Sequence, residues 1–307
     1  MKLSLGVGMD NPMRVVGYFL RAPMRLAYKS NFFSHVAQGL HEYLREKKVN
    51  MVFLGSEVDI DPRELRRSSW RKMPLEGIVM MGEVQPDFLS AVRELDRPLV
   101  YVSARSPGIC HSVNANEYQA AEYLVDHLYE LGHRHFAYFG SLQARMGNDE
   151  RLAGLRLALS RHELELPESA VLTLDEAERK QGYQMVEMLL RSPPKPFPTA
   201  IVCGNGLLGR GVLGRLFEEG FKAGRDVSVV AFDNTRVCSE ELPGITSASS
   251  MPEELGRESG RILLDPNLHG GDSLLDVVLP SKFFFRESSG PVASSSAKHV
   301  RSILKGN

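Results

Sequence analysis

Residues Val227 to Phe232 read VSVVAF, an unbroken, largely apolar run that ends at the acidic residue Asp233. A continuous apolar run rich in β-branched residues is typical of a strand with both faces buried, as in a parallel sheet flanked by helices. Arg151 and Asn205 likewise follow short apolar runs in the same half of the chain. Ligands bind at the carboxyl ends of strands in open α/β sheets, so these three polar side chains predict a binding site for a small polar molecule.

Short apolar runs alternate with segments of 3.6-residue periodicity along nearly the whole chain. Four predicted strands precede Gly132 and four follow it: residues 15–19, 51–54, 77–81, 99–102, 135–139, 171–174, 200–203 and 227–232. Strands that alternate with helices predict a parallel sheet. Two similar halves therefore predict an α/β fold with two doubly wound parallel-sheet lobes and a ligand cleft between them.

The composition is that of an ordinary globular protein. The chain has 307 residues, of which 43% are hydrophobic and 24% charged, which is enough for two lobes with large cores. The formal net charge of −1 gives no electrostatic reason for the bulk of the chain to bind nucleic acid. Any contact with DNA would need a separate basic element.

The cysteines indicate a reducing compartment. Cys110, Cys203 and Cys238 are an odd number without paired spacing, which argues against disulfides and against a zinc site. The first residues make a poor secretory signal, and no run approaches the ~18 apolar residues of a membrane helix. We expect a cytoplasmic protein without a membrane partner.

The turn from Gly204 to Gly209 matches the pattern G-x-G-x-x-G after a predicted strand. With Asp233 at the end of the next strand, it is a candidate dinucleotide fingerprint. Against this alternative, the fingerprint normally lies in the first βαβ unit, whereas here it lies in the third unit of the second half. Asn205 and the free N–H groups of the helix start could instead bind a hydroxyl or carboxylate group, or the turn could be purely structural.

The individual side chains also have structural alternatives. Arg151 could form a salt bridge with Asp149 or Glu150, although an arginine in a first helical turn opposes the helix dipole and a ligand oxygen would justify it better. Asp233 could cap the turn that follows its strand. Tyr28 lies in a long polar loop, from which its phenol could face the cleft.

Catalytic and metal-binding patterns are missing from the sequence. His133 and His135 form an H-x-H without an acidic or cysteine partner at metal-ligand spacing, so we expect solvated residues and not metal ligands. There is no G-x-S-x-G elbow and no P-loop. We expect a protein that is not an enzyme and that uses neither cofactor nor metal.

An ordered series of motifs resembles the effector-binding core of LacI/GalR-type transcription regulators over about residues 14–288. The motifs are NFFSHVAQGL, LEGIVMMG, RPLVYVS, AAEYLVDHLYELGHRHFAYFG, ERLAGLRLAL, PTAIVCGNG, DVSVVAFDN, PGITSAS, PEELGRESGRILL and LPSKFFFRES. The resemblance implies a periplasmic-binding-protein-like type I fold whose lobes close on a sugar or another small effector. It also implies that Arg151, Asn205 and Asp233 are principal effector contacts, with Ser103 and Ser249 at matching strand-tip or hinge positions.

The resemblance also implies how the chain is divided. We expect a first lobe of residues 14–133 completed by 250–275, a second lobe of residues 134–249 completed by 276–288, and a flexible tail of residues 289–307, with three crossovers between the lobes. The expected function is the effector-sensing domain of a transcription regulator that acts as a homodimer. The main alternative is a sugar-binding protein that serves a transporter.

The chain departs from the family pattern at three positions. Gly206 and Ser103 stand where the family usually has acidic residues, and Ala177 stands where it often has an aromatic residue that stacks on the ligand. Each change removes a sugar contact that the family makes. On this view, Gly206→Asp restores the usual acid and is expected to preserve or strengthen polyol binding.

Only about thirteen residues precede the first predicted strand, so we expect the family's amino-terminal DNA-binding domain to have no counterpart in these residues. The xylose-operon activators resemble this arrangement, since they carry an AraC-type DNA-binding domain after the core. Residues 297–305 could begin such a connection as a short basic helix. We therefore expect this chain to be the effector part of a longer regulator that contacts DNA only through a domain not present here.

Overall fold

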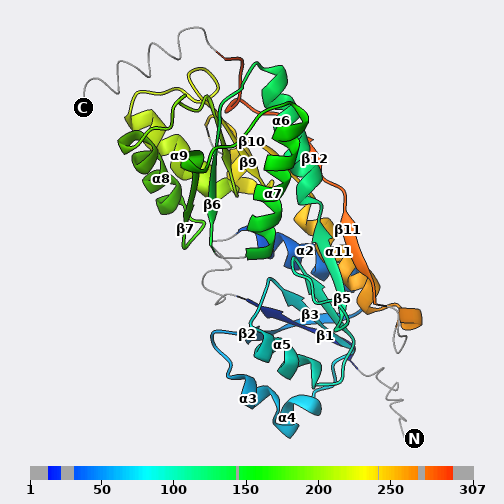
Figure 1. Cartoon of the computed structure of the whole chain (residues 1–307). Helices are drawn as coiled ribbons and strands as arrows, with labels where there is room; N and C mark the ends of the chain where they lie inside the picture. Colours follow the sequence, from blue (N-terminus) through cyan, green and yellow to red (C-terminus); the bar gives the residue numbers. More distant parts are fainter. Residues whose placement is uncertain (1–12, 22–30, 143–144, 241, 269–273, 293–307) are drawn as a thin grey trace, which may run out of the picture.

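The chain forms two α/β lobes that are stacked end to end (Figure 1). The computed structural model describes residues 13–21, 31–142, 145–240, 242–268 and 274–292. Each lobe contains one six-stranded sheet, and strand pairing is parallel except between the last two strands of the second sheet. The predicted fold class is thereby confirmed.

The first sheet has the order β11-β5-β4-β3-β1-β2. Its strands are β1 (Val15–Leu20), β2 (Asn50–Ser56), β3 (Gly77–Met81), β4 (Leu99–Val102), β5 (His111–Ala115) and β11 (Asp276–Leu279). Its helices are α2 (Asn31–Glu46), α3 (Pro62–Leu65), α4 (Ser68–Arg71), α5 (Pro86–Arg93) and α11 (Pro252–Leu263), with a 3-10 turn at Pro266–Leu268. Two apolar clusters, one with α2 and α11 and one with α5, form the core of this lobe.

The second sheet has the order β12-β10-β9-β8-β6-β7. Its strands are β6 (Phe136–Ser141), β7 (Val171–Leu174), β8 (Ala200–Cys203), β9 (Ser228–Phe232), β10 (Thr246–Ser249) and β12 (Lys282–Phe284). Its helices are α6 (Glu117–Glu130), α7 (Arg145–Arg161), α8 (Arg179–Arg191), α9 (Gly206–Glu218) and α10 (Arg236–Glu240), with a 3-10 turn at Glu168–Ala170. β8 lies between β6 and β9, so the carboxyl ends of these three strands are neighbours.

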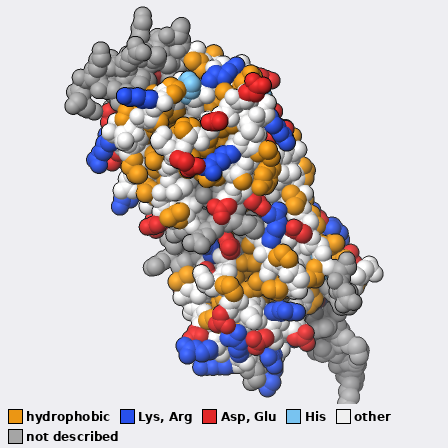
Figure 2. Space-filling model, in the orientation of Figure 1, with side chains coloured by type: hydrophobic (Ala, Val, Ile, Leu, Met, Phe, Trp, Pro, Cys, Tyr) orange, Lys and Arg blue, Asp and Glu red, His pale blue; other side chains and the backbone are white. Residues whose placement is uncertain are grey.

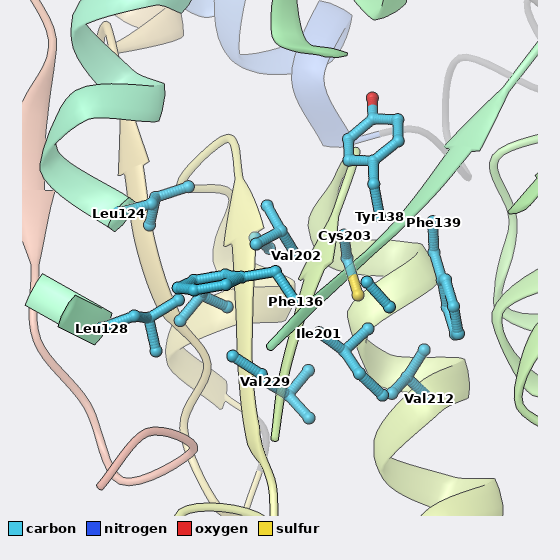
Figure 3. Close-up of a cluster of buried hydrophobic side chains, with 14 of the residues drawn as sticks. Leu124, Leu128, Phe136, Tyr138, Phe139, Ile201, Val202, Cys203, Val212 and Val229 are labelled. Atoms are coloured by element: carbon cyan, nitrogen blue, oxygen red, sulfur yellow. The ribbon is translucent and has the colours of Figure 1, made fainter. Parts of the chain in front are cut away.

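The core of the second lobe is a single apolar cluster. Figure 3 shows Leu124 and Leu128 of α6 on one side of the strands and Val212 of α9 on the other. Every residue of β8 and β9 is buried. Burial on both faces explains why these strands read as continuous apolar runs.

Two of the predicted lobe limits are wrong. Helix α6 was assigned to the first lobe, but Leu124 and Leu128 pack in the core of the second. The segment from residue 276 was assigned to the second lobe, but β11 pairs with β5 in the first sheet, and only β12 pairs with β10 in the second. Pro280 and Ser281 separate the two strands, so the segment assigned as a whole to the second lobe changes lobe within its length.

Three crossovers connect the lobes, as predicted: β5 to α6, β10 to α11, and β11 to β12. Hydrogen bonds tie the three segments to one another. The Asn116 N–H donates to the Leu279 carbonyl at 3.0 Å, the Ser250 hydroxyl donates to the same carbonyl at 2.7 Å, and the Ser281 hydroxyl donates to the Asn116 carbonyl at 2.9 Å. These short, mutually bonded segments form the hinge.

The tail that was predicted to be flexible from residue 289 begins later. Ser288 and Ser289 are buried, and the Val292 N–H donates to the Leu131 carbonyl at 3.0 Å. Residues 288–292 are therefore packed on the second lobe. The predicted basic helix at 297–305 lies outside the described residues.

His133 was expected to be solvated, and this is wrong. His133 is 2% exposed, and its ring hydrogen bonds to the Thr199 hydroxyl at 2.9 Å and to the Gly290 carbonyl at 3.0 Å. Burial lowers the pKa of His133 to about 4, despite the Gly290 carbonyl, which raises it. The neutral ring, with one nitrogen donating and the other accepting, therefore locks the packed tail against the start of β6.

On the face of the molecule that Figure 2 presents, neither sign of charge predominates. Figure 2 shows acidic and basic side chains interspersed over the face that it presents, in line with the net charge of −1. Among the described residues, no helix is long and apolar enough to cross a membrane. Within the same part of the chain, His, Cys, Asp and Glu side chains form no group of three that could hold a metal ion.

Candidate functional site

The predicted site is built on the carboxyl ends of β6, β8 and β9 in the second lobe. α7 follows β6 and carries Arg151, Asn205 lies in the turn after β8, and Asp233 directly follows β9. Because these strands are adjacent in the sheet, their tips bring residues far apart in the sequence to one edge.

Arg151 makes two short contacts within the protein. One terminal nitrogen donates to the Gly204 carbonyl at 2.6 Å, and the other donates to Oε1 of Glu117 at 2.7 Å. The side chains of Arg151 and Glu117 are only 20% and 10% exposed, so this is a largely buried ion pair. Burial lowers the pKa of Arg151, but the Glu117 carboxylate more than offsets burial and leaves that pKa above its usual value.

Glu117 was not among the predicted site residues. It follows the Asn116 cap in the first turn of α6, where an acid is also expected for its interaction with the helix dipole. The predicted structural alternatives for Arg151, Asp149 and Glu150, are not the partners of its guanidinium in the described structure. The sequence carries no local signal that distinguishes Glu117 from other acids in a first helical turn.

Asn205 is the amino-terminal cap of α9. Its side-chain oxygen accepts from the Leu208 N–H at 2.8 Å, and its side-chain nitrogen donates to the Ala177 carbonyl at 2.9 Å. The carboxamide thus joins the β8 turn to the turn that follows β7. It is half-buried, and its orientation is fixed by these two bonds.

Asp233 is 7% exposed and has a φ of 70°. One carboxylate oxygen accepts from the Gly206 N–H and the other from the Thr235 N–H, each at 3.3 Å. Burial raises the pKa of the Asp233 carboxyl, while Arg151 and these backbone donors lower it, and the balance lies above the usual value. The predicted structural alternative, a cap for the following turn, is present in the Thr235 contact.

The guanidinium, the amide and the carboxylate are brought together by the turn at residues 204–206. Arg151 bonds to its first residue, Asn205 is its second, and Asp233 bonds to its third. The Arg151 Nε is also a buried donor without a hydrogen-bond partner among the described residues. A buried donor without a partner is rare in folded proteins. Beside a buried carboxylate, it leaves a hydrogen bond that a polar ligand could make at this edge of the sheet.

Ser103 lies at the corresponding edge of the first lobe, directly after β4. Its φ is 57°, and its buried hydroxyl oxygen likewise has no hydrogen-bond partner within the described part of the chain. Two residues further on, Arg105 forms an ion pair with Glu150, which precedes Arg151 in α7. This contact brings the β4 tip of one lobe close to the α7 end of the other.

The two remaining predicted residues do not add to this set. Ser249 is buried at the end of β10, and its hydroxyl donates to the Ser250 carbonyl at 2.7 Å, which places it in the hinge. Tyr28 lies outside the described residues.

The start of α9 is already occupied by groups of the protein itself. The Gly206 N–H bonds to the Asp233 carboxylate and the Leu208 N–H to Asn205. In a dinucleotide fingerprint these amides would face a pyrophosphate, which a buried carboxylate at the same place would repel. The arrangement argues against the dinucleotide alternative.

Gly206 also has a packing role that the sequence did not reveal. A Cβ atom at this position would lie 2.6 Å from Sγ of Cys238 and 3.2 Å from Oδ1 of Asp233. A second carboxylate would therefore meet both a steric clash and the charge of Asp233. This packing argues against the expectation that Gly206→Asp would preserve or strengthen polyol binding.

Comparisons with known proteins agree with this architecture. The family model described as a periplasmic binding protein-like domain matches residues 125–289. The arabinose metabolism transcriptional repressor of Geobacillus stearothermophilus is 24% identical over 266 residues, which are 84% of this chain and 73% of the repressor.

Solved structures share the fold at similar levels of identity. A transcriptional regulator CelR–cellobiose complex has a TM-score of 0.79 at 24% identity and covers 91% of this chain and 86% of its own. A LacI family transcriptional regulator from Enterococcus faecium with bound ribose has a TM-score of 0.77 at 21% identity and covers 91% of this chain and 100% of its own. Because the family match spans more than half of the sequence and the two-lobed fold agrees with it, the chain belongs to the periplasmic binding protein-like domain family.

Proposed function

We propose that the chain is the effector-sensing domain of a transcription regulator and binds a small sugar or related polyol between its lobes. The observation that carries the proposal is the buried Arg151 donor and the buried Asp233 carboxylate, which follow β6 and β9 on either side of β8. A guanidinium donates to the oxygen of a sugar hydroxyl, and a carboxylate accepts from its O–H. Two structural neighbours are complexes with cellobiose and ribose, and one relative is an arabinose metabolism repressor.

Each lobe would contribute to the site. Arg151 and Asp233 would bind the ligand from the second lobe, Asn205 would hold the turn between them, and the Ser103 hydroxyl would bind from the first lobe. A ligand that contacts both lobes favours the closed arrangement, and the shift between open and closed populations is the signal. No bond is made or broken, so the domain is a sensor and not an enzyme.

The charges favour an uncharged ligand. Arg151 carries one positive charge, whereas Glu117 and Asp233 carry one negative charge each, so this buried group has a net charge of −1 when both acids are ionised. A phosphate ester placed there would meet uncompensated negative charge. We therefore propose a neutral sugar and not a sugar phosphate.

A thermal-shift screen tests this function. Neutral pentoses, hexoses and disaccharides are compared with sugar phosphates, purines and nicotinamide dinucleotides. We expect one neutral sugar to raise the melting temperature, because a ligand at 100 times its Kd stabilises the folded state by about 2.7 kcal/mol. A response to a dinucleotide alone, or to phosphorylated sugars in preference to neutral ones, would contradict the proposal.

Three further proposals concern DNA contact, the oligomeric state and the cellular compartment. We propose that DNA contact is made by a separate domain, that the regulator is a homodimer and that it acts in the cytoplasm. The xylose-operon activator arrangement gains no support from the comparisons and stays a prediction. The sequence of the gene beyond Asn307 tests it directly.

A further inference from the structure

Two ion pairs join the lobes within the described part of the chain. Arg105, in the loop after β4, pairs with Glu150 of α7. Lys282 of β12 pairs with Glu254 of α11 at 2.7 Å. The Lys282–Glu254 pair lies near the hinge and is the more exposed of the two. The Arg105–Glu150 pair lies further from the hinge along the chain and is more enclosed.

The Lys282–Glu254 pair lies at the hinge itself. Lys282 immediately follows the crossover between β11 and β12, and Glu254 lies in the first turn of α11, which follows another crossover. The two side chains are 53% and 47% exposed. A solvent-exposed pair beside the rotation axis changes little when the lobes rotate, and it contributes little to stability in either arrangement.

The Arg105–Glu150 pair is more enclosed and belongs to the ligand-binding edge. The side chains of Arg105 and Glu150 are 27% and 18% exposed. Arg105 lies two residues beyond Ser103, and Glu150 directly precedes Arg151, so the pair connects the strand tips from which the proposed effector contacts come. Opening the lobes at this edge would separate the two charges.

The first lobe holds Arg105 in place for this contact. Nε of Arg105 donates to Oδ2 of Asp276 at 3.1 Å. The other oxygen of Asp276 accepts from the Ser112 hydroxyl at 2.5 Å and from the Asn114 side-chain nitrogen at 3.0 Å. The guanidinium is thus anchored to β5 and β11, and less side-chain entropy is lost when it binds Glu150.

We propose that Arg105 is a positioning residue that clamps Glu150 and so stabilises the closed arrangement of the lobes before any effector binds. The proposal rests on the proposed effector function, because closure is the signal of that function. The clamp fixes the amino-terminal part of α7, and with it Arg151, relative to the first lobe. The strength of this contact sets the fraction of molecules that are closed without an effector, and therefore the fraction that an effector can still shift from open to closed.

The test measures the separation of the lobes without any ligand. Spin labels are attached at Glu64→Cys in α3 and Lys180→Cys in α8, both exposed positions, and the distance between them is measured by pulsed electron spin resonance. We expect Arg105→Gln and Glu150→Gln each to shift the ratio of open to closed molecules by about fivefold toward the open form. The double variant should open no further than the larger single effect, because both substitutions act through one contact.

Two matched variants distinguish the effect of breaking the Arg105–Glu150 contact from the effect of removing any one positive charge. Lys282→Gln breaks the exposed pair at the hinge, and Arg66→Gln removes an arginine whose two carboxylate partners, Asp87 and Glu94, both lie in its own lobe. Neither should change the distance distribution. An unchanged distribution in Arg105→Gln and Glu150→Gln, or an equal shift in Lys282→Gln, would overturn the proposal. Since no effector is present, this outcome is independent of whether a sugar binds.

Discussion

Arg151→Ala is expected to lower the free energy of unfolding by about 3–5 kcal/mol, in addition to abolishing effector binding. Removal of the guanidinium leaves the Glu117 carboxylate, of which only 10% is exposed, without its partner. It also removes the donor to the Gly204 carbonyl. The loss is measured by urea denaturation followed by circular dichroism.

A control on the same helix distinguishes the loss of a buried ion pair from the loss of a positive charge alone. Arg156 pairs with Glu168 across side chains that are 44% and 81% exposed, so Arg156→Ala should change stability by less than ~1 kcal/mol. Glu117→Gln combined with Arg151→Ala should cost less than the sum of the two single changes, since the uncompensated charge is then absent. Equal losses in Arg151→Ala and Arg156→Ala would show that the Arg151 pair has no special structural role.

Acidification is expected to destabilise the second lobe between pH 6.5 and about pH 4, by about 1.4 kcal/mol per pH unit from His133 alone. The pKa of His133 is 6.5 in the unfolded chain and about 4 in the fold, so the unfolded state takes up the proton first. The stabilisation is complete above pH 6.5 and is lost as the pH falls toward 4. Over the whole interval the loss amounts to about 3 kcal/mol.

The H-x-H sequence supplies a matched pair of variants for this effect. His133→Gln should flatten the dependence of the urea midpoint on pH across this interval, because the glutamine does not titrate. His135→Gln should leave the slope intact, since His135 is exposed. Burial also lowers the pKa of His127, which contributes the residual slope. A slope that is unaffected in His133→Gln would contradict the assignment.

The sequence was sufficient to predict eight of the twelve strands in the described residues, because burial on both faces leaves a local mark. The strands β5, β10, β11 and β12 were not among those predicted. The run VSVVAF became β9 with every side chain of Ser228–Phe232 buried. The position of Arg151, Asn205 and Asp233 at adjacent tips followed from the same strands. Such patterns depend on neighbours in the sequence and on the period of the element.

Contacts between residues far apart in the sequence leave no local pattern, so they could not be predicted in this way. The pairing of Arg151 with Glu117 joins residues from two helices, and nothing local distinguishes Glu117 from any other acid in a first helical turn. The assignment of α6 to the wrong lobe has the same origin, because an amphipathic pattern predicts a buried face and not the sheet on which that face packs. The packing role of Gly206 could not be predicted for the same reason, because the Cys238 sulfur that a side chain there would meet lies in another helix.

On the proposed function, polar groups from both lobes bind one neutral ligand. Isothermal titration of the sugar found by thermal shift, into the unmodified chain, Asp233→Asn and Ser103→Ala, tests it most directly. A hydrogen bond to a charged group contributes about 1.5–3 kcal/mol, so Asp233→Asn should raise the Kd at least tenfold, and Ser103→Ala should raise it severalfold without a loss of stability. Unchanged affinity in both variants, each shown to be folded, would contradict the claim that the ligand is held between these strand tips.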